Sequence, residues 1–218
     1  MRRLALFDLD GTLARGDTLR GFVPRLLARH PGRWPRALLL PCFFAAYAAG
    51  LLDRGRLKGG ILHLLFAGLP RAAVAPVAQG FAAHVLARRL FAAGLDELRS
   101  HLAAGDLVVL LSASPDLYVP EIGRLLGVHE THCTQVRWHA GNLDGRLDGP
   151  NRRGPEKTRV LAGLRSAHPG LPVIAYGNSP SDLDHMRLCE QAVFVNARGR
   201  LAARLAAADP AIRRVQWS

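Results

Sequence analysis

The chain has 218 residues, of which 49% are hydrophobic and 21% charged, and its formal net charge is +12. This length is enough for one sizeable core, or for one core with a smaller insert. The three cysteines are odd in number and widely spaced, which argues against a disulfide framework and indicates a reducing cytoplasm. We expect no signal peptide, because the sequence goes straight into a motif-bearing strand.

The positive charge comes almost entirely from arginine, since only Lys58 and Lys157 are lysines among 29 basic residues. One interpretation is a coding bias. The other is attraction to anionic partners, such as phosphorylated substrates, anionic lipid or nucleic acid. We find no basic patch with interleaved aromatic residues and no helix-turn-helix pattern, so we expect no nucleic-acid partner. The sequence indicates no particular oligomeric state.

The first predicted element is a buried strand from Leu4 to Phe7, which ends where charged residues begin. Asp8 and Asp10 emerge on the same side of the strand end, and Gly11 lets the chain turn away. Two carboxylates this close repel each other unless a cation lies between them or one is protonated. The pattern therefore favours a metal site, or a pair in which one carboxylate attacks and the other moves a proton.

The segment Asp8-Leu9-Asp10-Gly11-Thr12 resembles the Asp-x-Asp-Gly-Thr signature of the haloacid dehalogenase superfamily. The resemblance implies that Asp8 attacks a phosphate and forms an aspartyl-phosphate. It also implies that Asp10 protonates the leaving group and later activates water. Asp17 lies just beyond this motif, where phosphoserine phosphatases have an acid that contacts the substrate amine. We keep Asp17 as a candidate substrate-binding residue and, equally, as a hinge or helix N-cap.

Residues 15 to about 90 are predicted to be wholly helical. Their least polar stretch, 37–52, is uncharged over 16 residues, which is short of the roughly 20 residues that a membrane span needs. Two interpretations stay open for it. It is a buried helix of a small bundle, or it is an apolar surface facing a lipid or an apolar substrate. Basic residues flank the stretch, as on interfacial elements: Arg33, Arg36, Arg54, Arg56 and Lys58.

From about residue 91 onward, helices and strands alternate. Continuous apolar strands are typical of a parallel sheet covered on both faces, and they occur at 107–111, 173–176 and 192–195. Helical segments such as 95–103 and 160–167 lie between them. The alternation predicts an α/β fold with a doubly wound parallel sheet. A hairpin over 136–147 interrupts the pattern, and 213–217 fits a last edge strand.

A helical block inserted just after the first strand of such a sheet resembles subclass IB of the superfamily, the phosphoserine phosphatase-like hydrolases. There a small helical cap closes over the active site. The resemblance covers nearly the whole chain. It implies a Rossmann-like catalytic core formed by residues 1–14 and 91–218, with a helical cap formed by residues 15–90.

Ser112 and Ala113 directly follow the predicted strand 107–111, and they resemble the family's second motif, which binds phosphate. The hydroxyl of Ser112 is a hydrogen-bond donor for a phosphate oxygen. We predict a helix immediately afterwards, with Ser114 as its N-cap, Pro115 at its first position and Gly127 after its last turn. A helix N-terminus at the end of a parallel strand is a ready anion site.

Lys157 is predicted to lie in the first turn of a helix, two residues after Pro155. A cation there opposes the helix dipole, at a cost of about 0.3–1 kcal/mol. A compact charge that serves a phosphate and an aspartate explains a lysine at this point better than a surface position does. Lys157 resembles the family's third motif, which implies a catalytic and phosphate-binding role.

The segment from Tyr176 to Asp182 resembles the fourth motif and starts another helix at Ser179-Pro180. The family has two aspartates here, and this chain has Asn178 in place of the first, with Asp182 matching the second. The resemblance implies Mg²⁺ bound by Asp8, the backbone carbonyl of Asp10 and Asn178, with Asp182 holding a metal-bound water. An amide oxygen binds a hard cation without adding charge, so we expect weak Mg²⁺ affinity.

These motifs predict a Mg²⁺-dependent phosphomonoesterase that works through an aspartyl-phosphate. The apolar stretch with basic flanks favours a lipid-like phosphate, resembling the phosphatidylglycerophosphatases of this subclass, and peripheral contact with the anionic inner face of a membrane. Two alternatives stay open. One is a phosphatase for a small polar ester, as in phosphoserine phosphatase. The other is a phosphate-binding regulator that lost turnover, an alternative that Asn178 keeps open.

Overall fold

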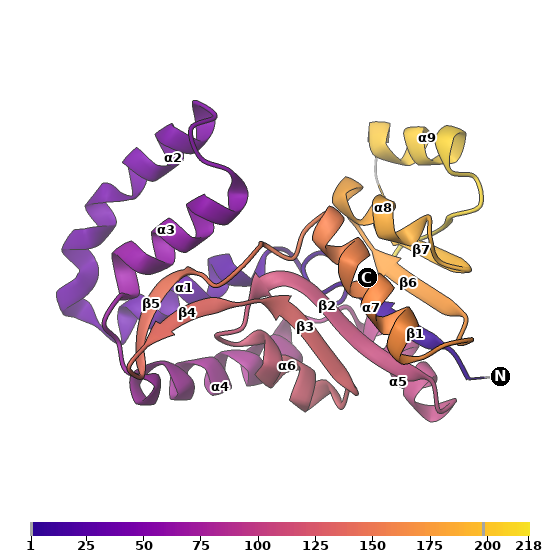
Figure 1. Ribbon diagram of the computed structural model, residues 1–218, viewed down its shortest axis with the longest axis horizontal. Coiled ribbons are helices and arrows are strands. Elements are labelled where there is room, and N and C mark those ends of the chain that lie inside the picture. Colours follow the sequence, from indigo (N-terminus) through magenta and orange to yellow (C-terminus); the bar gives the residue numbers. More distant parts are fainter. Residues whose placement is uncertain (1, 198) are drawn as a thin grey trace.

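The centre of the molecule is a six-stranded parallel sheet in the order β3-β2-β1-β6-β7-β8 (Figure 1). The structure, a computed structural model, describes residues 2–197 and 199–218. The strand order reverses at β1, so that β2 and β3 lie on one side of it and β6, β7 and β8 on the other. The strands are β1 (Leu4–Phe7), β2 (Leu107–Pro115), β3 (Glu130–Thr134), β6 (Val173–Gly177), β7 (Gln191–Val195) and β8 (Arg213–Val215).

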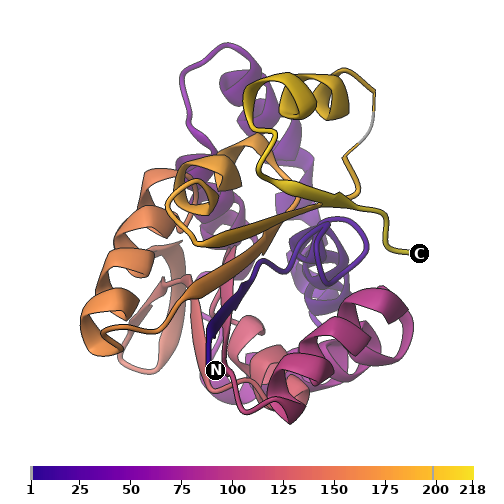
Figure 2. The same cartoon turned by 90° about the vertical axis from the view of Figure 1, so that its right-hand side faces the viewer.

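Alternate residues of β1 supply two apolar cores, one on each face of the sheet. Leu4 and Leu6 pack with residues of α7 (Pro155–Ala167), α8 (Leu183–Met186) and α9 (Gly199–Ala208). Ala5 and Phe7 pack with residues of α5 (Ala92–Ala103) and α6 (Val119–Leu126). Figure 2 shows helices on both sides of the sheet. This two-sided burial explains the continuous apolar runs and confirms the predicted doubly wound α/β fold.

One predicted boundary is wrong. Strand β2 continues through Pro115, and α6 begins at Val119 rather than at Pro115. The reason is that Pro115 pairs with Thr134 of β3, so the chain stays extended where a helix was expected. Gly127 does end α6 in the left-handed region, at a φ of 72°, as predicted. Strand β3 was not predicted, because an edge strand of mostly polar residues has no apolar run.

Between β1 and α5 the chain is wholly helical, as predicted. We call residues 18–88 the helical insert. Its elements are α1 (Thr18–Ala28), the 3₁₀ helix η1 (Pro31–Leu39), α2 (Leu40–Ala48), α3 (Arg54–Phe66) and α4 (Arg71–Arg88). The antiparallel hairpin of β4 (Val136–His139) and β5 (Asn142–Leu147) lies against α3 (Figure 1). Gly145 permits this contact, because a Cβ there would lie 2.6 Å from the backbone of His63.

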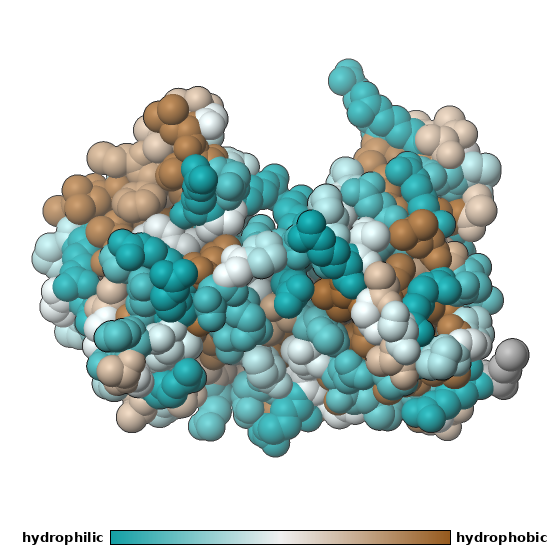
Figure 3. Space-filling model, viewed as in Figure 1, coloured by the Kyte–Doolittle hydropathy of each residue, from teal (hydrophilic) through white to brown (hydrophobic). Residues whose placement is uncertain are grey.

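The apolar stretch 37–52 is exposed. No residue of η1 or α2, both fully within the described ranges, is buried, and Leu38 and Leu51 are 80% and 71% exposed. The structure thus contradicts the interpretation as a buried bundle helix, because η1 contacts α1 and α3 and α2 contacts η1 and α3, while every residue of both elements stays at least partly exposed. Figure 3 shows the result as a brown projection over α2. We call its exposed large side chains the apolar tip: Trp34, Leu38, Leu39, Phe44 and Leu51.

Within residues 2–197 and 199–218, no helix has the length and apolar character that crossing a membrane requires.

Candidate active site

Polar side chains converge at the carboxyl ends of β1, β2 and β6, where the strand order reverses. In open α/β sheets this is the usual place for a ligand site. Asp8 and Asp10 follow β1, Ser112 lies near the end of β2, and Asn178 follows β6. Helix α7 brings Lys157 to the same edge from its first turn, after Pro155 at the first helical position, as predicted. The topology therefore gathers residues from four distant segments.

Lys157 lies between two aspartates. Its Nζ is 2.6 Å from Oδ1 of Asp8 and 2.7 Å from Oδ1 of Asp182. The lysine is 2% exposed. Burial by itself would lower the pKa of Lys157, but the two carboxylates outweigh it and raise that pKa. The ammonium therefore stays charged. Its third hydrogen has no partner among the described residues and is available to a ligand.

The carboxylate of Asp8 is held on both oxygens, since Oδ2 accepts a hydrogen bond of 2.9 Å from the Thr12 hydroxyl. Burial raises the pKa of Asp8 to about 7, against the opposing charge of Lys157. Asp10 accepts hydrogen bonds from the Ser114 hydroxyl, at 2.5 Å, and from the backbone N–H of Thr18, at 2.6 Å. Burial also raises the pKa of Asp10, and these hydrogen bonds oppose the rise.

Ser114 has a different role from the predicted helix cap, because it orients Asp10. The last part of β2 also carries Ser112, whose Oγ accepts the backbone N–H of Ser114 at 3.0 Å. The hydrogen of the Ser112 hydroxyl has no acceptor among the described residues, so it remains free for an anion. Asp17 caps α1, and its Oδ1 accepts the N–H of Leu19 at 2.9 Å. The N-cap interpretation is confirmed, and substrate contact by Asp17 stays a prediction.

Asp182 and Asn178 shape the loop after β6. Oδ2 of Asp182 accepts the N–H and the hydroxyl of Ser179, at 3.0 and 2.8 Å, in a capping box at the start of η2 (Pro180–Asp182). Burial would raise the pKa of Asp182, but Lys157 and these hydrogen bonds lower it. The Asn178 amide lies against Gly11, where a Cβ would come within 2.0 Å of its Nδ2. Gly11, at a φ of 81°, is therefore required for both the turn and this approach.

The donors at this edge fit Mg²⁺, which prefers oxygen ligands. They are the carboxylate of Asp8, the backbone carbonyl of Asp10 and the side-chain oxygen of Asn178. Asp8 and Asp182 face the buried ammonium of Lys157, and Asp10 adds a third carboxylate whose charge acts on Asp8. A divalent cation would offset the excess negative charge before an anion enters. Among the described residues no three His, Cys, Asp or Glu side chains are grouped closely enough to hold a metal. Backbone and amide oxygens would therefore have to complete the ligand set.

Lys58 is a site residue that the sequence analysis missed, since it appeared there only as a flank of the apolar stretch. It extends from α3, and its Nζ donates to the backbone carbonyl of Ala113 and to Oδ1 of Asn151, the latter at 2.8 Å. Burial lowers the pKa of Lys58 to about 8, and the carboxylate of Asp10 opposes that change. Both lysines of this arginine-rich chain thus lie at one site. That rarity was the signal available in the sequence.

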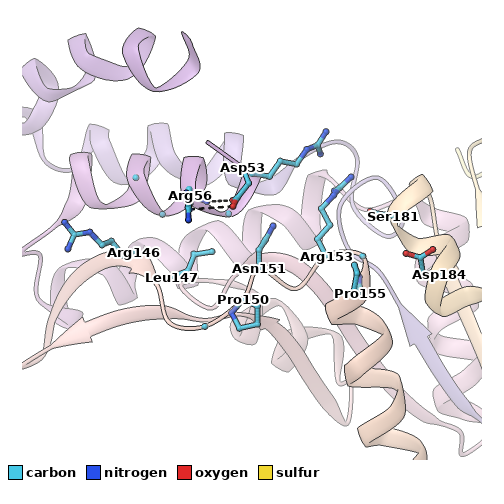
Figure 4. A pocket seen from close by; sticks show the side chains of 16 residues that line it. Asp53, Arg56, Arg146, Leu147, Pro150, Asn151, Arg153, Pro155, Ser181 and Asp184 are labelled. Carbon is cyan, nitrogen blue, oxygen red and sulfur yellow. Dashed lines mark hydrogen bonds and ion pairs between the residues drawn. The ribbon is translucent and has the colours of Figure 1, made fainter. Parts of the chain in front are cut away.

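A cleft of about 920 Å³ adjoins these residues, between the helical insert and the core (Figure 4). One wall is the first half of α3, and the other is the segment from Arg146 to Pro155. Ser181 and Asp184 close the end nearest η2. Asp184 is exposed.

Comparison with known proteins matches most of the chain to a family of hydrolases. The family model of haloacid dehalogenase-like hydrolases matches residues 5–187. Protein CicA of Caulobacter vibrioides is 30% identical over 201 residues, which cover 91% of this chain and 88% of that protein. Phosphoserine phosphatase SerB1 of Mycobacterium tuberculosis is 27% identical over 208 residues, which cover 90% of this chain and 66% of that one.

Solved structures share the fold. A protein of unknown function from Bordetella pertussis Tohama I matches with a TM-score of 0.81 and 25% identity, over 99% of this chain and 98% of that one. A substrate-bound phosphoserine phosphatase matches with a TM-score of 0.66 and 16% identity, over 94% and 90% of the two chains.

Proposed function

Because this chain belongs to the haloacid dehalogenase-like hydrolases, as a phosphatase of the phosphoserine phosphatase-like kind, we propose that Asp8 is its nucleophile and Mg²⁺ its cofactor. The observation that carries the proposal is the clamp on Asp8. Lys157 and Thr12 each bind one of its oxygens, so the carboxylate is fixed in place before a phosphate arrives. A group held in one orientation reacts without the cost of ordering it in the transition state.

The reaction proceeds in two displacements. First, a carboxylate oxygen of Asp8 bonds to phosphorus while the bond from phosphorus to the ester oxygen breaks, and Asp10 gives a proton to that oxygen. Next, Asp10 takes a proton from a water molecule whose oxygen attacks phosphorus. The bond to Asp8 then breaks and inorganic phosphate leaves. The raised pKa of Asp10 suits the first step, because it favours the protonated form that acts as an acid.

Positioning of the phosphate and the charges around it supply most of the remaining stabilisation of the transition state. The unused hydrogen of the Lys157 ammonium and the unused hydroxyl hydrogen of Ser112 are donors for phosphate oxygens. Ala113 adds its backbone from the same end of β2. In the proposed ligand set, Asp8, the carbonyl of Asp10 and Asn178 bind Mg²⁺, with Asp182 at the outer side of the same site. Bound Mg²⁺ would offset the repulsion between the carboxylate and the incoming phosphate.

The division into a core of residues 1–14 and 91–218 and a cap of residues 15–90 is part of the proposal. Lys58 supports it, because this side chain of the helical insert binds the carbonyl of Ala113 near the end of β2, beside Ser112. In this arrangement the insert covers the site, which would exclude water, and the Lys58 ammonium is already at the site. Lys58 is then a positioning residue for the end of β2.

For the substrate we propose a lipid-like phosphate, with peripheral contact at an anionic, cytoplasmic membrane face. The exposed apolar tip supports this, since large exposed apolar patches mark interaction surfaces. Arginines stand beside the tip, among them Arg33, Arg36 and Arg54. A small polar ester is the second candidate, favoured by the arginines that line the cleft. A regulator without turnover is disfavoured by the clamp on Asp8.

We expect Asp8→Asn to lower hydrolysis of p-nitrophenyl phosphate by at least about a thousandfold, since an amide does not attack phosphorus. We would measure steady-state rates with Mg²⁺, with a chelator and after Mg²⁺ is restored. These rates test both the nucleophile and the Mg²⁺ requirement. Asp96→Asn, an exposed change on α5, serves as the control and should keep wild-type rates. Substantial turnover by a folded Asp8→Asn protein would exclude Asp8 as the nucleophile.

We expect Lys58→Met to lower kcat/KM for the same ester about tenfold, which corresponds to about 1.4 kcal/mol of transition-state stabilisation. Lys58→Gln keeps a hydrogen-bond donor without the charge and should recover part of the loss. Arg88→Met removes an exposed charge from α4 and should change nothing. Equal kcat/KM for Lys58→Met and Arg88→Met, with unchanged melting temperatures, would show that Lys58 does not position the phosphate-binding end of β2.

For the apolar tip we expect co-sedimentation with phosphatidylcholine vesicles that contain phosphatidylglycerol, weakening as salt rises, since each nearby basic residue adds about 1 kcal/mol. Leu38→Glu should reduce this binding without unfolding the protein, because Leu38 is 80% exposed. Leu188→Glu is the matched control, an exposed leucine on the core. If neither wild type nor control binds at low salt, the membrane contact is wrong.

A further inference from the structure

The cleft beside the site is dominated by arginine. Four line it and two acids accompany them: Arg54, Arg56, Arg146 and Arg153, with Asp53 and Asp184. Figure 3 shows the hollow between the helical insert and the core. In Figure 4, Arg153 rises from the wall formed by the segment from Arg146 to Pro155. This excess of positive charge lies where two surfaces face each other, so its field is concentrated in the cleft.

Among the described residues, two of these guanidinium groups have no acidic partner, although Nε of Arg54 donates a hydrogen bond of 3.2 Å to the Tyr47 hydroxyl. The side chain of Arg56 lies 3.8 Å from a carboxylate oxygen of Asp53, and that of Arg146 lies 4.0 Å from Asp144. In the part of the chain that the structure describes, no carboxylate oxygen lies within 4.0 Å of Arg54 or Arg153. Arg153 is also half-buried, unlike the solvated arginines of the surface. A half-buried guanidinium without a counter-charge is better satisfied when an anion binds.

The cleft is continuous with the residues proposed to hold the phosphate. Gly154 and Pro155 line it and begin α7, whose first turn carries Lys157. Asn151 lines it too, and accepts a hydrogen bond from Lys58, which also binds the loop of Ser112. The part of a substrate beyond the reacting phosphate therefore has this basic space next to it.

We propose that the cleft binds a second anionic group on the leaving-group side of the substrate. The preferred substrates are then phosphomonoesters that carry a further phosphodiester, phosphate or carboxylate. A planar guanidinium donates two parallel hydrogen bonds to such groups. Arg153 and Arg54 are the residues that bind the second anionic group. The inference rests on the proposed phosphatase function, and it holds for soluble and lipid-linked substrates alike.

The test uses three butyl phosphates that differ at the far end, which carries a carboxylate, a methyl phosphodiester or a neutral carboxamide. We expect kcat/KM of the wild-type enzyme to be about tenfold higher for the two anionic esters than for the carboxamide. The ratio of kcat/KM for an anionic ester to kcat/KM for the carboxamide should fall as ionic strength rises, because the cleft is open to solvent. The carboxylate and phosphodiester arms distinguish which anion the cleft prefers.

In Arg153→Gln and Arg54→Gln the ratio should fall toward one, because kcat/KM for the anionic esters drops most. Arg88→Gln removes the same charge from α4, away from the cleft, and should keep the wild-type ratio. Melting temperatures check that every variant is folded. Equal kcat/KM for all three esters, or an unchanged ratio in both cleft variants, overturns the inference alone. An enzyme that hydrolyses none of the esters overturns the proposed function and this inference with it.

Discussion

The buried ammonium of Lys157 holds together the carboxyl end of the sheet, where the proposed active site lies. It reaches Asp8 after β1 and Asp182 after β6 from a third segment, helix α7. A buried charge that loses its partners costs several kcal/mol, so each of these residues constrains the other two. Without Lys157, two carboxylates would face each other across the strand ends, and neither loop would keep its position. The same ammonium that fixes the loops has one hydrogen left for a phosphate.

Most of this edge could be predicted from the sequence because each motif follows an apolar strand. In a doubly wound sheet the carboxyl ends of parallel strands meet at one edge, so Asp8, Ser112 and Asn178 had to lie close together. Lys157 was predictable from its conflict with the helix dipole and from the rarity of lysine. These arguments use only local pattern and topology, which is why they succeed.

The remaining features depend on partners far away in the chain. Ser114 was predicted as a helix cap by local rules, but its hydroxyl binds Asp10, 104 residues earlier, and the strand runs on. The apolar stretch 37–52 was compatible with burial or exposure, because its hydrophobicity does not reveal that the neighbouring helices α1 and α3 leave it uncovered. Lys58 acts across the boundary between insert and core, a contact that no spacing rule detects.

The central claim is that Asp8 becomes covalently phosphorylated during turnover. Rapid quenching of the wild-type enzyme with a ³²P-labelled phosphomonoester in Mg²⁺, followed by peptide mapping, tests it most directly. The account predicts a hydroxylamine-sensitive label on the peptide that contains Asp8, at a level that rises and decays as fast as turnover requires. A label on a residue other than Asp8 would contradict it. Turnover without any labelled protein, under conditions where phosphorylation of the enzyme is faster than hydrolysis of the phosphoenzyme, would also contradict it.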